Sequence, residues 1–136
     1  MSILSRERLR GLHVLIVDDD RDAREALEQS LQFLGARADG VASAKEARSF
    51  LERFRPDVLL SDLSMPEEDG YTLLTSIRRL PNERGGNVPA AAVTAIANPG
   101  DRRRAFDVGF QALIPKPFGL HEIAEAVASL ARLPSA

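Results

Sequence analysis

The stretch HVLIVDDD at residues 13–20 is a short apolar run that ends abruptly in three aspartates. A run that is apolar throughout, without alternating polar residues, is typical of a strand buried on both faces of a parallel sheet. The aspartates then stand at the carboxyl end of this strand. The stretch therefore predicts an α/β fold and a polar site at one edge of its sheet.

Downstream of this strand, helical and strand patterns alternate. Small or apolar residues recur at spacings of four, four and three in residues 22–34, which predicts an amphipathic helix that stops at Gly35. The same alternation predicts further strands at 37–41, 58–61, 90–93 and 112–114, and further helices from Ser43 until Pro56, at 70–80, at 99–108 and from Leu120 onward.

Five strand and helix units in alternation require crossover connections, which are right-handed almost always. The sequence therefore predicts a flavodoxin-like, doubly wound, five-stranded parallel sheet of order 2-1-3-4-5, with helices on both faces. Between the third helix and the fourth strand, the turn-rich stretch 81–89 predicts an exposed, mobile loop.

The 136 residues, with 44% hydrophobic and 28% charged, fit a single globular domain. We expect this domain at residues 12–133, preceded by an N-terminal extension at 1–11 and followed by a C-terminal tail at 134–136. Nothing in the composition indicates a second domain.

Charge, cysteine content and hydropathy exclude several classes of function. The net charge of -2 gives no general attraction to nucleic acid, so direct DNA binding is not expected. No apolar run approaches the ~20 residues of a membrane span, and the first residues lack a secretory signal. The chain has no cysteine, which agrees with a reducing compartment. We expect a cytoplasmic protein without membrane contact.

Polar residues follow four of the predicted strands. Asp18 and Asp19 follow the first strand, Asp62 the third and Thr94 the fourth, and Lys116 lies just beyond the fifth. Ligands of open α/β sheets bind outside the carboxyl ends of the strands, where the strand order reverses. We therefore expect these five side chains to share one pocket.

Three carboxylates in one pocket repel one another, so keeping them ionised requires a cation. Mg²⁺ fits best, because carboxylates, waters and a phosphate oxygen are its usual ligands. A carboxylate beside Mg²⁺, an ammonium and a hydroxyl is suited to phosphoryl transfer. In this hypothesis Asp62 is the nucleophile, Asp18 and Asp19 hold the metal, and Lys116 and Thr94 bind the phosphoryl group.

Four segments, VLIVDDD, LLSDLSMPEEDG, AAAVTA and PKPF, resemble in order and spacing the signatures of bacterial two-component receiver domains. The resemblance covers about residues 12 to 133, and four ordered signatures make a chance match improbable. It implies a signalling domain, not an enzyme, that accepts a phosphoryl group from the phosphohistidine of a histidine kinase or a histidine phosphotransfer protein.

The resemblance also implies a role for each matching residue. Asp62 is the phosphoacceptor, Thr94 the switch hydroxyl and Lys116 the lysine that contacts the phosphoryl group. The backbone carbonyl of Ser64 is a further Mg²⁺ ligand beside Asp18 and Asp19. The Lys116-Pro117 peptide bond is expected to be cis.

A second resemblance concerns residues 82–118, which look like receivers fused to hybrid sensor kinases. It implies covalent fusion to such a kinase, and a stand-alone receiver stays open. Two residues depart from the family pattern: Leu113 stands where an aromatic switch residue is common, and Pro115 removes a backbone donor from the fifth strand, which an edge strand tolerates.

Other interpretations compete with this one. Asp20 and Asp22 are better explained by the start of a helix than by a metal site. A phosphatase of the haloacid dehalogenase type would use Asp18 and Asp20 as a D-x-D motif, but it would leave Asp62 without a role. A pseudo-receiver would keep the fold without phosphorylation.

Overall fold

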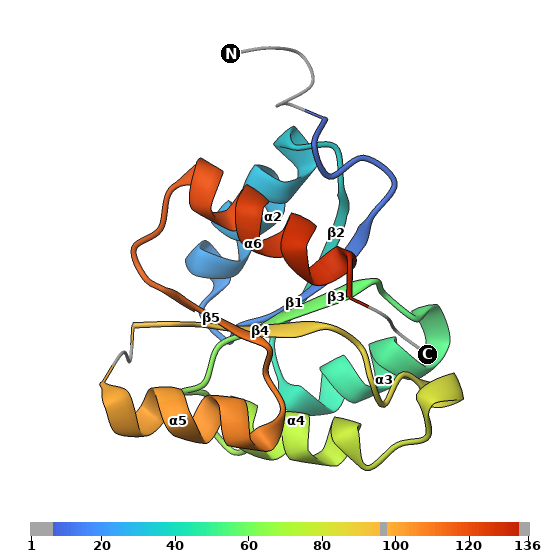
Figure 1. Ribbon diagram of the computed structural model, residues 1–136, viewed down its shortest axis with the longest axis vertical. Helices are drawn as coiled ribbons and strands as arrows, with labels where there is room; N and C mark the ends of the chain where they lie inside the picture. Colours follow the sequence, from blue (N-terminus) through green and yellow to red (C-terminus); the bar gives the residue numbers. More distant parts are fainter. Residues whose placement is uncertain (1–6, 96–97, 134–136) are drawn as a thin grey trace.

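The computed structural model describes residues 7–95 and 98–133, in which five strands form one parallel sheet between two layers of helices (Figure 1). The strands are β1 (His13–Val17), β2 (Arg37–Val41), β3 (Val58–Ser61), β4 (Ala90–Thr94) and β5 (Ala112–Pro115). The helices are α2 (Arg21–Phe33), α3 (Ala44–Phe54), α4 (Gly70–Arg78), the 3-10 helix η1 (Asn82–Arg84), α5 (Pro99–Val108) and α6 (Leu120–Ala131).

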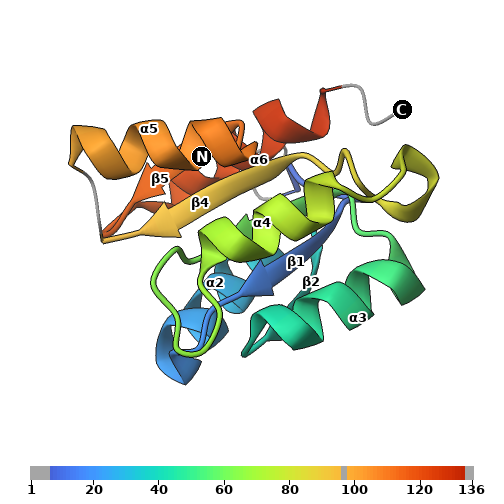
Figure 2. The same cartoon turned by 90° about the horizontal axis from the view of Figure 1, so that it is seen from below.

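The strand order is β2-β1-β3-β4-β5, and every neighbouring pair is parallel. Helices α2 and α6 cover one face of the sheet, and α3, α4 and α5 cover the other (Figures 1 and 2). The predicted flavodoxin-like fold is confirmed. Pro115 lies in an edge strand, as its missing N–H group requires.

Strand β1 explains why the opening stretch is apolar throughout. Val14 and Ile16 belong to the core cluster under α2 and α6, whereas Leu15 and Val17 belong to the cluster under α3, α4 and α5. All four side chains are at most 1% exposed. Because successive side chains of a strand point to opposite faces, a strand between two helical layers needs an apolar residue at every position.

Side-chain caps fix where the helices begin. The carboxylate of Asp20 accepts hydrogen bonds from the backbone N–H groups of Asp22 and Ala23, as expected for the start of a helix. Ser43, Asp69 and Asn98 cap α3, α4 and α5 in the same way. Asp20, Ser43 and Asn98 lie shortly after the carboxyl end of a strand, so few residues connect β1 to α2, β2 to α3 and β4 to α5.

The stretch at 81–89 is exposed, as predicted, only at residues 81–84, whereas residues 85–89 are half-buried or buried. Residues Asn82–Arg84 form a 3-10 helix, and Val88 is buried in the core. Arg78 at the end of α4 donates hydrogen bonds to the carbonyl oxygens of Gly86 (3.0 Å), Val88 (2.7 Å) and Gly109. A half-buried guanidinium therefore links this loop to the end of α5.

The N-terminal extension packs on the domain from residue 7 onward. The side chain of Leu9 is fully buried in the α2–α6 core cluster, and its N–H group donates to the carbonyl of Leu34 at 2.9 Å. The rest of the extension, residues 1–6, and the tail at 134–136 lie outside the described residues, so the domain boundaries stay a prediction. Across residues 7–95 and 98–133, no helix is both long enough and apolar enough to span a membrane.

Candidate functional site

Two strand ends bring three carboxylates together. Asp18 and Asp19 follow β1, and Asp62 follows β3, the strand beside it in the sheet. One oxygen of each carboxylate lies within 4.8 Å of the others. Asp18 is buried, Asp62 is half-buried and Asp19 is exposed. The cluster therefore has one side held by protein and one side open to solvent.

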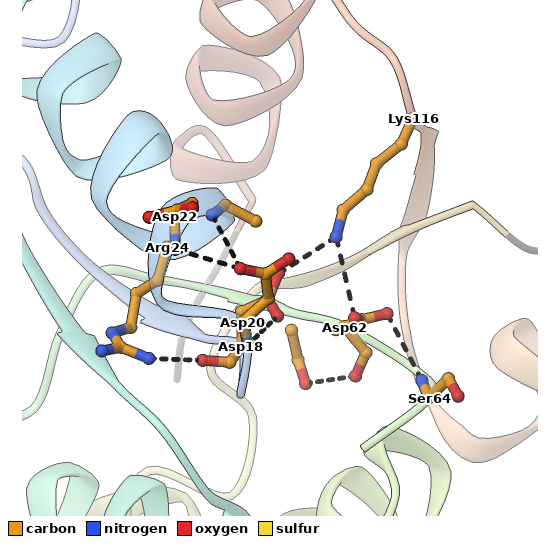
Figure 3. A network of polar contacts seen from close by, with 9 residues as sticks. Asp18, Asp20, Asp22, Arg24, Asp62, Ser64 and Lys116 are labelled. Carbon is orange, nitrogen blue, oxygen red and sulfur yellow. Dashed lines mark hydrogen bonds and ion pairs between the residues drawn. The ribbon is translucent and has the colours of Figure 1, made fainter.

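Lys116 closes the cluster from the end of β5 (Figure 3). Its Nζ lies 3.0 Å from Oδ2 of Asp18 and 3.6 Å from Oδ2 of Asp62. The peptide bond between Lys116 and Pro117 is cis, as predicted. One ammonium is thus shared by two of the three carboxylates.

The loop between β1 and α2 is held by contacts to Asp18. The N–H group of Asp20 donates to Oδ1 of Asp18 at 2.9 Å, and Nη1 of Arg24 donates to the backbone carbonyl of Asp18 at 2.9 Å (Figure 3). Arg24 also lies against Gly40 of β2, where a Cβ would come within 2.6 Å of its Cγ. The sequence reasoning missed Arg24, because an arginine on a helix surface has no local signal for such a contact.

The electrostatics of the site reflect this crowding. Burial raises the pKa of Asp62, the ammonium of Lys116 opposes the rise, and the charge of Asp18 adds to it. Burial disfavours the charge of Lys116, but the hydrogen bond to Asp18 and the charges of both carboxylates outweigh burial and raise the pKa of the ammonium. A further cation in the cluster would relieve the repulsion at Asp62.

The loop between β3 and α4 folds back on the site. The N–H group of Ser64, an exposed residue, donates to Oδ1 of Asp62 at 3.3 Å. A Cβ on Gly70 would lie 2.2 Å from the carbonyl oxygen of Asp62, so only glycine fits there.

The same loop also contacts α3. Glu67 has a positive φ of 67°, and Glu68 forms an ion pair with Arg48 of α3. This ion pair was not predicted from the sequence.

Thr94 lies on β4, the strand beside β3, and Leu113 lies on β5, the edge strand beside β4. Thr94 is buried at the end of β4, and its carbonyl accepts a hydrogen bond from the N–H group of Lys116 at 2.9 Å. Leu113 is half-buried, lies opposite Ala92 in the β4–β5 register, and packs against the α3–α5 core cluster. Thr94 therefore neighbours the backbone of Lys116, and Leu113 lies under the helical layer.

The donor set of the acidic cluster fits Mg²⁺. Three carboxylates offer only oxygen ligands, and their mutual distance allows a single small cation to contact all three. The exposure of Asp19 leaves one side of the cluster open for waters or a phosphate oxygen. Asp18, Asp19 and Asp62 are the residues that could hold the metal.

Residues 14–128 match the family model of the response regulator receiver domain. The chain belongs to this family. The match covers β1 except His13, the other four strands and most of α6, and it includes every candidate site residue.

Relatives and solved structures agree with this assignment. The chain is 42% identical over 111 residues to an uncharacterized 14.6 kDa protein of Leptolyngbya boryana, covering 82% of this chain and 83% of that protein. It is 34% identical over 121 residues to response regulator MprA of Mycobacterium leprae, covering 89% of this chain. The matched part is 51% of MprA, so the chain spans about half the length of that regulator.

The receiver domain of sensor histidine kinase PA1611 from Pseudomonas aeruginosa PAO1 has a similar structure, with a TM-score of 0.81 and 33% identity. The similarity covers 89% of this chain and 98% of that domain, whose structure has a magnesium ion coordinated in the active site cleft. The receiver fold of the present chain is therefore shared with a domain of a sensor kinase.

Proposed function

We propose that this receiver domain accepts a phosphoryl group from a phosphohistidine onto Asp62 in a reaction that depends on Mg²⁺. The observation that carries the proposal is that one carboxylate oxygen each of Asp18, Asp19 and Asp62 lie within 4.8 Å of one another. The ammonium of Lys116 contacts Asp18 and Asp62. This combination of charges suits a phosphoryl group, which brings several negative oxygens into the site.

In the proposed step, a carboxylate oxygen of Asp62 attacks the phosphorus of the donor. A phosphorus–oxygen bond forms while the bond from phosphorus to the imidazole nitrogen breaks, and that nitrogen keeps the electron pair. The product is an acyl phosphate on Asp62 and a free histidine on the donor. Mg²⁺ held by Asp18, Asp19, Asp62 and the backbone carbonyl of Ser64 would neutralise charge on the phosphoryl oxygens.

The remaining residues bind and orient the phosphoryl group. Lys116 offers a point charge, and its contacts to Asp18 and Asp62 keep the ammonium at the site before the donor arrives. Thr94 donates a hydrogen bond to a phosphoryl oxygen and changes its position with phosphorylation. Leu113 stands at the aromatic switch position of the family. The domain assists its own phosphorylation and dephosphorylation and otherwise acts as a switch for a partner-binding face.

The proposed donor is a histidine kinase or a histidine phosphotransfer protein. Similarity to the receiver of sensor histidine kinase PA1611 supports covalent fusion to a hybrid kinase, whereas the short Leptolyngbya boryana relative supports a stand-alone receiver. We propose neither direct nucleic-acid binding nor membrane contact, since the net charge is only -2. The proposed location is the cytoplasm, in agreement with a chain that has no cysteine.

The geometry disfavours the phosphatase alternative. That reaction would need the carboxylate of Asp20 beside Asp18, but Asp20 caps α2 and accepts hydrogen bonds from backbone N–H groups there. Asp62, which would have no role in such a phosphatase, lies within the carboxylate cluster. A pseudo-receiver would share this fold, so only a phosphorylation experiment distinguishes it from the proposed phosphoacceptor.

Incubation with acetyl phosphate, with and without Mg²⁺, tests the proposal. We expect intact mass to rise by one phosphoryl group only when Mg²⁺ is present, and the adduct to be lost on hydrolysis of the acyl phosphate. Asp62→Asn should not gain this mass, because an amide cannot act as the nucleophile. Turnover of acetyl phosphate that persists in Asp62→Asn would instead support a phosphatase, and absence of both reactions in the wild type would support a pseudo-receiver.

A further inference from the structure

The loop between β3 and α4 carries Asp62 and Ser64, yet it departs from a relaxed backbone conformation. Glu67 has a φ of 67°, a region that residues other than glycine rarely occupy. Such a conformation persists when neighbouring contacts hold it in place. The loop therefore needs an anchor close to residue 67.

Arg48 provides a contact at the next residue. Its Nη1 and Nη2 donate to Oε2 and Oε1 of Glu68 at 2.5 Å and 2.7 Å, a two-pronged pairing of guanidinium and carboxylate. Nη1 also lies 3.4 Å from Oγ of Ser76, whose hydroxyl in turn donates to the carbonyl of Leu73. One side chain of α3 thus contacts both the loop and α4.

Helices α3 and α4 lie side by side, with the loop before α4 at the same end of the molecule as the start of α2 (Figure 2). The base of the loop is closed by the N–H group of Gly70, which donates to the carbonyl of Leu63 at 3.0 Å. Arg48 holds the opposite part of the loop. Hydrogen bonding to Arg48 lowers the pKa of Glu68, so the pair is ionised and attractive at neutral pH.

We propose that Arg48 is a positioning residue of the metal site, which acts through Glu68 to hold the β3–α4 loop in the conformation that binds Mg²⁺. The inference rests on the proposed function, because it concerns the same cluster of carboxylates. Arg48 touches neither the metal nor the phosphoryl group. Its effect is on the fraction of molecules whose loop is ready to bind.

Calorimetric titration of the whole chain with MgCl₂ tests this role. Arg48→Met keeps most of the length of the side chain but removes the guanidinium group that donates to Glu68. Glu68→Gln removes the negative charge with almost no change of shape. We expect each substitution to raise the Mg²⁺ Kd by about fivefold. This change corresponds to a variant in which about one molecule in five has the β3–α4 loop in the conformation that binds Mg²⁺. The double variant should show the same fivefold change, because both substitutions remove one interaction.

Arg84→Met is the matched control. Arg84 forms an ion pair with Glu52, which lies on α3 like Arg48, but the pair joins α3 to η1 and not to the β3–α4 loop. This variant should keep the wild-type Kd. Amide exchange without Mg²⁺ supplies a second measurement: Arg48→Met should speed exchange at Glu68, whose N–H group donates to the carbonyl of Pro66, and Arg84→Met should not.

The outcomes separate the two proposals. A wild-type chain that binds no Mg²⁺ overturns the proposed function and this inference with it. Normal wild-type binding with an unchanged Kd in Arg48→Met and Glu68→Gln overturns the inference alone. Equal losses of affinity in Arg48→Met and Arg84→Met would also overturn it, because Arg48 would then act through general stability. A double variant whose change in Kd is the product of the two single changes would overturn it as well, because Arg48 and Glu68 would then act independently.

Discussion

The ammonium of Lys116 lies 3.0 Å from Oδ2 of Asp18, which joins two residues that are 98 positions apart in the chain. Asp18 is only 6% exposed, so this contact and the N–H group of Asp20 replace most of its hydration. The same carboxylate is a proposed ligand of Mg²⁺. Lys116 and the metal therefore compete for part of the negative charge of the cluster.

This competition predicts opposite effects for Lys116→Met. Without the ammonium the three carboxylates repel one another more strongly, so Mg²⁺ should bind severalfold more tightly than in the wild type. Phosphorylation by acetyl phosphate should nevertheless slow by about 100-fold, because one fixed donor to the phosphoryl group is lost. Calorimetry and intact mass measure the two effects, and a weaker Mg²⁺ affinity together with an unchanged rate would contradict the assigned role.

The ion pair of Arg48 and Glu68 predicts a pH dependence of stability. Because the pKa of Glu68 is lowered in the folded chain, its contribution is present above the unfolded value and is lost as pH falls through the folded value. Both side chains are partly exposed, so the contribution at neutral pH should be about 0.5–1 kcal/mol. Urea unfolding of wild type and Glu68→Gln should differ by this amount at about pH 7, and the two should converge below the folded pKa of Glu68. A difference that grows as pH falls would have the wrong sign.

Arg78 predicts a larger effect on folding. Arg78→Met removes the donors to the carbonyls of Gly86, Val88 and Gly109 and to the side chain of Gln111. Acceptors left without a partner in a half-buried place should lower the free energy of unfolding by about 3 kcal/mol. Arg79→Met, one position along and exposed, should change it by less than about 0.5 kcal/mol. Equal effects in urea titrations would mean that the hydrogen bonds of Arg78 do not stabilise the two loops.

Thr94 and Leu113 should contribute unequally to switching. Leu113 packs in the α3–α5 core cluster and offers neither a ring nor a hydroxyl, so its rotamers should differ little in energy between phosphorylated and unphosphorylated states. Thr94→Ala should remove most phosphorylation-dependent partner binding, whereas Leu113→Ala should change the coupling by less than about 1 kcal/mol. Titration of the partner against both forms of each variant measures the coupling, and equal losses would make Leu113 a working switch residue.

The fold could be predicted because its signals are local. Each buried strand is a short apolar run, and Asp20 is followed by a helix with a regular apolar stripe, so the observed ends of most elements lie within a few residues of those expected. The meeting of Asp18, Asp19, Asp62 and Lys116 also followed, because the topology alone brings these strand ends together.

The residues around the site could not be predicted in the same way. Arg48 and Glu68 are 20 positions apart in the chain. Arg24 donates to the backbone carbonyl of Asp18, and a backbone acceptor is present at every residue, so the sequence does not mark this one. Long charged side chains on helices are usually solvated, so a single sequence does not distinguish these arginines from their neighbours. The burial of Leu9 was missed for a related reason, because one apolar residue in a charged segment shows no periodicity.

The close approach of Gly70 to the carbonyl of Asp62 restricts how this part of the chain can vary. A side chain of any size at position 70 would collide with backbone and not with a movable group, so no neighbouring substitution can make room for it. Glu67, by contrast, could be replaced by glycine with relief of backbone strain. Two positions three residues apart thus differ in their relation to glycine: position 70 requires glycine, whereas position 67 carries glutamate in a conformation that glycine would adopt without strain.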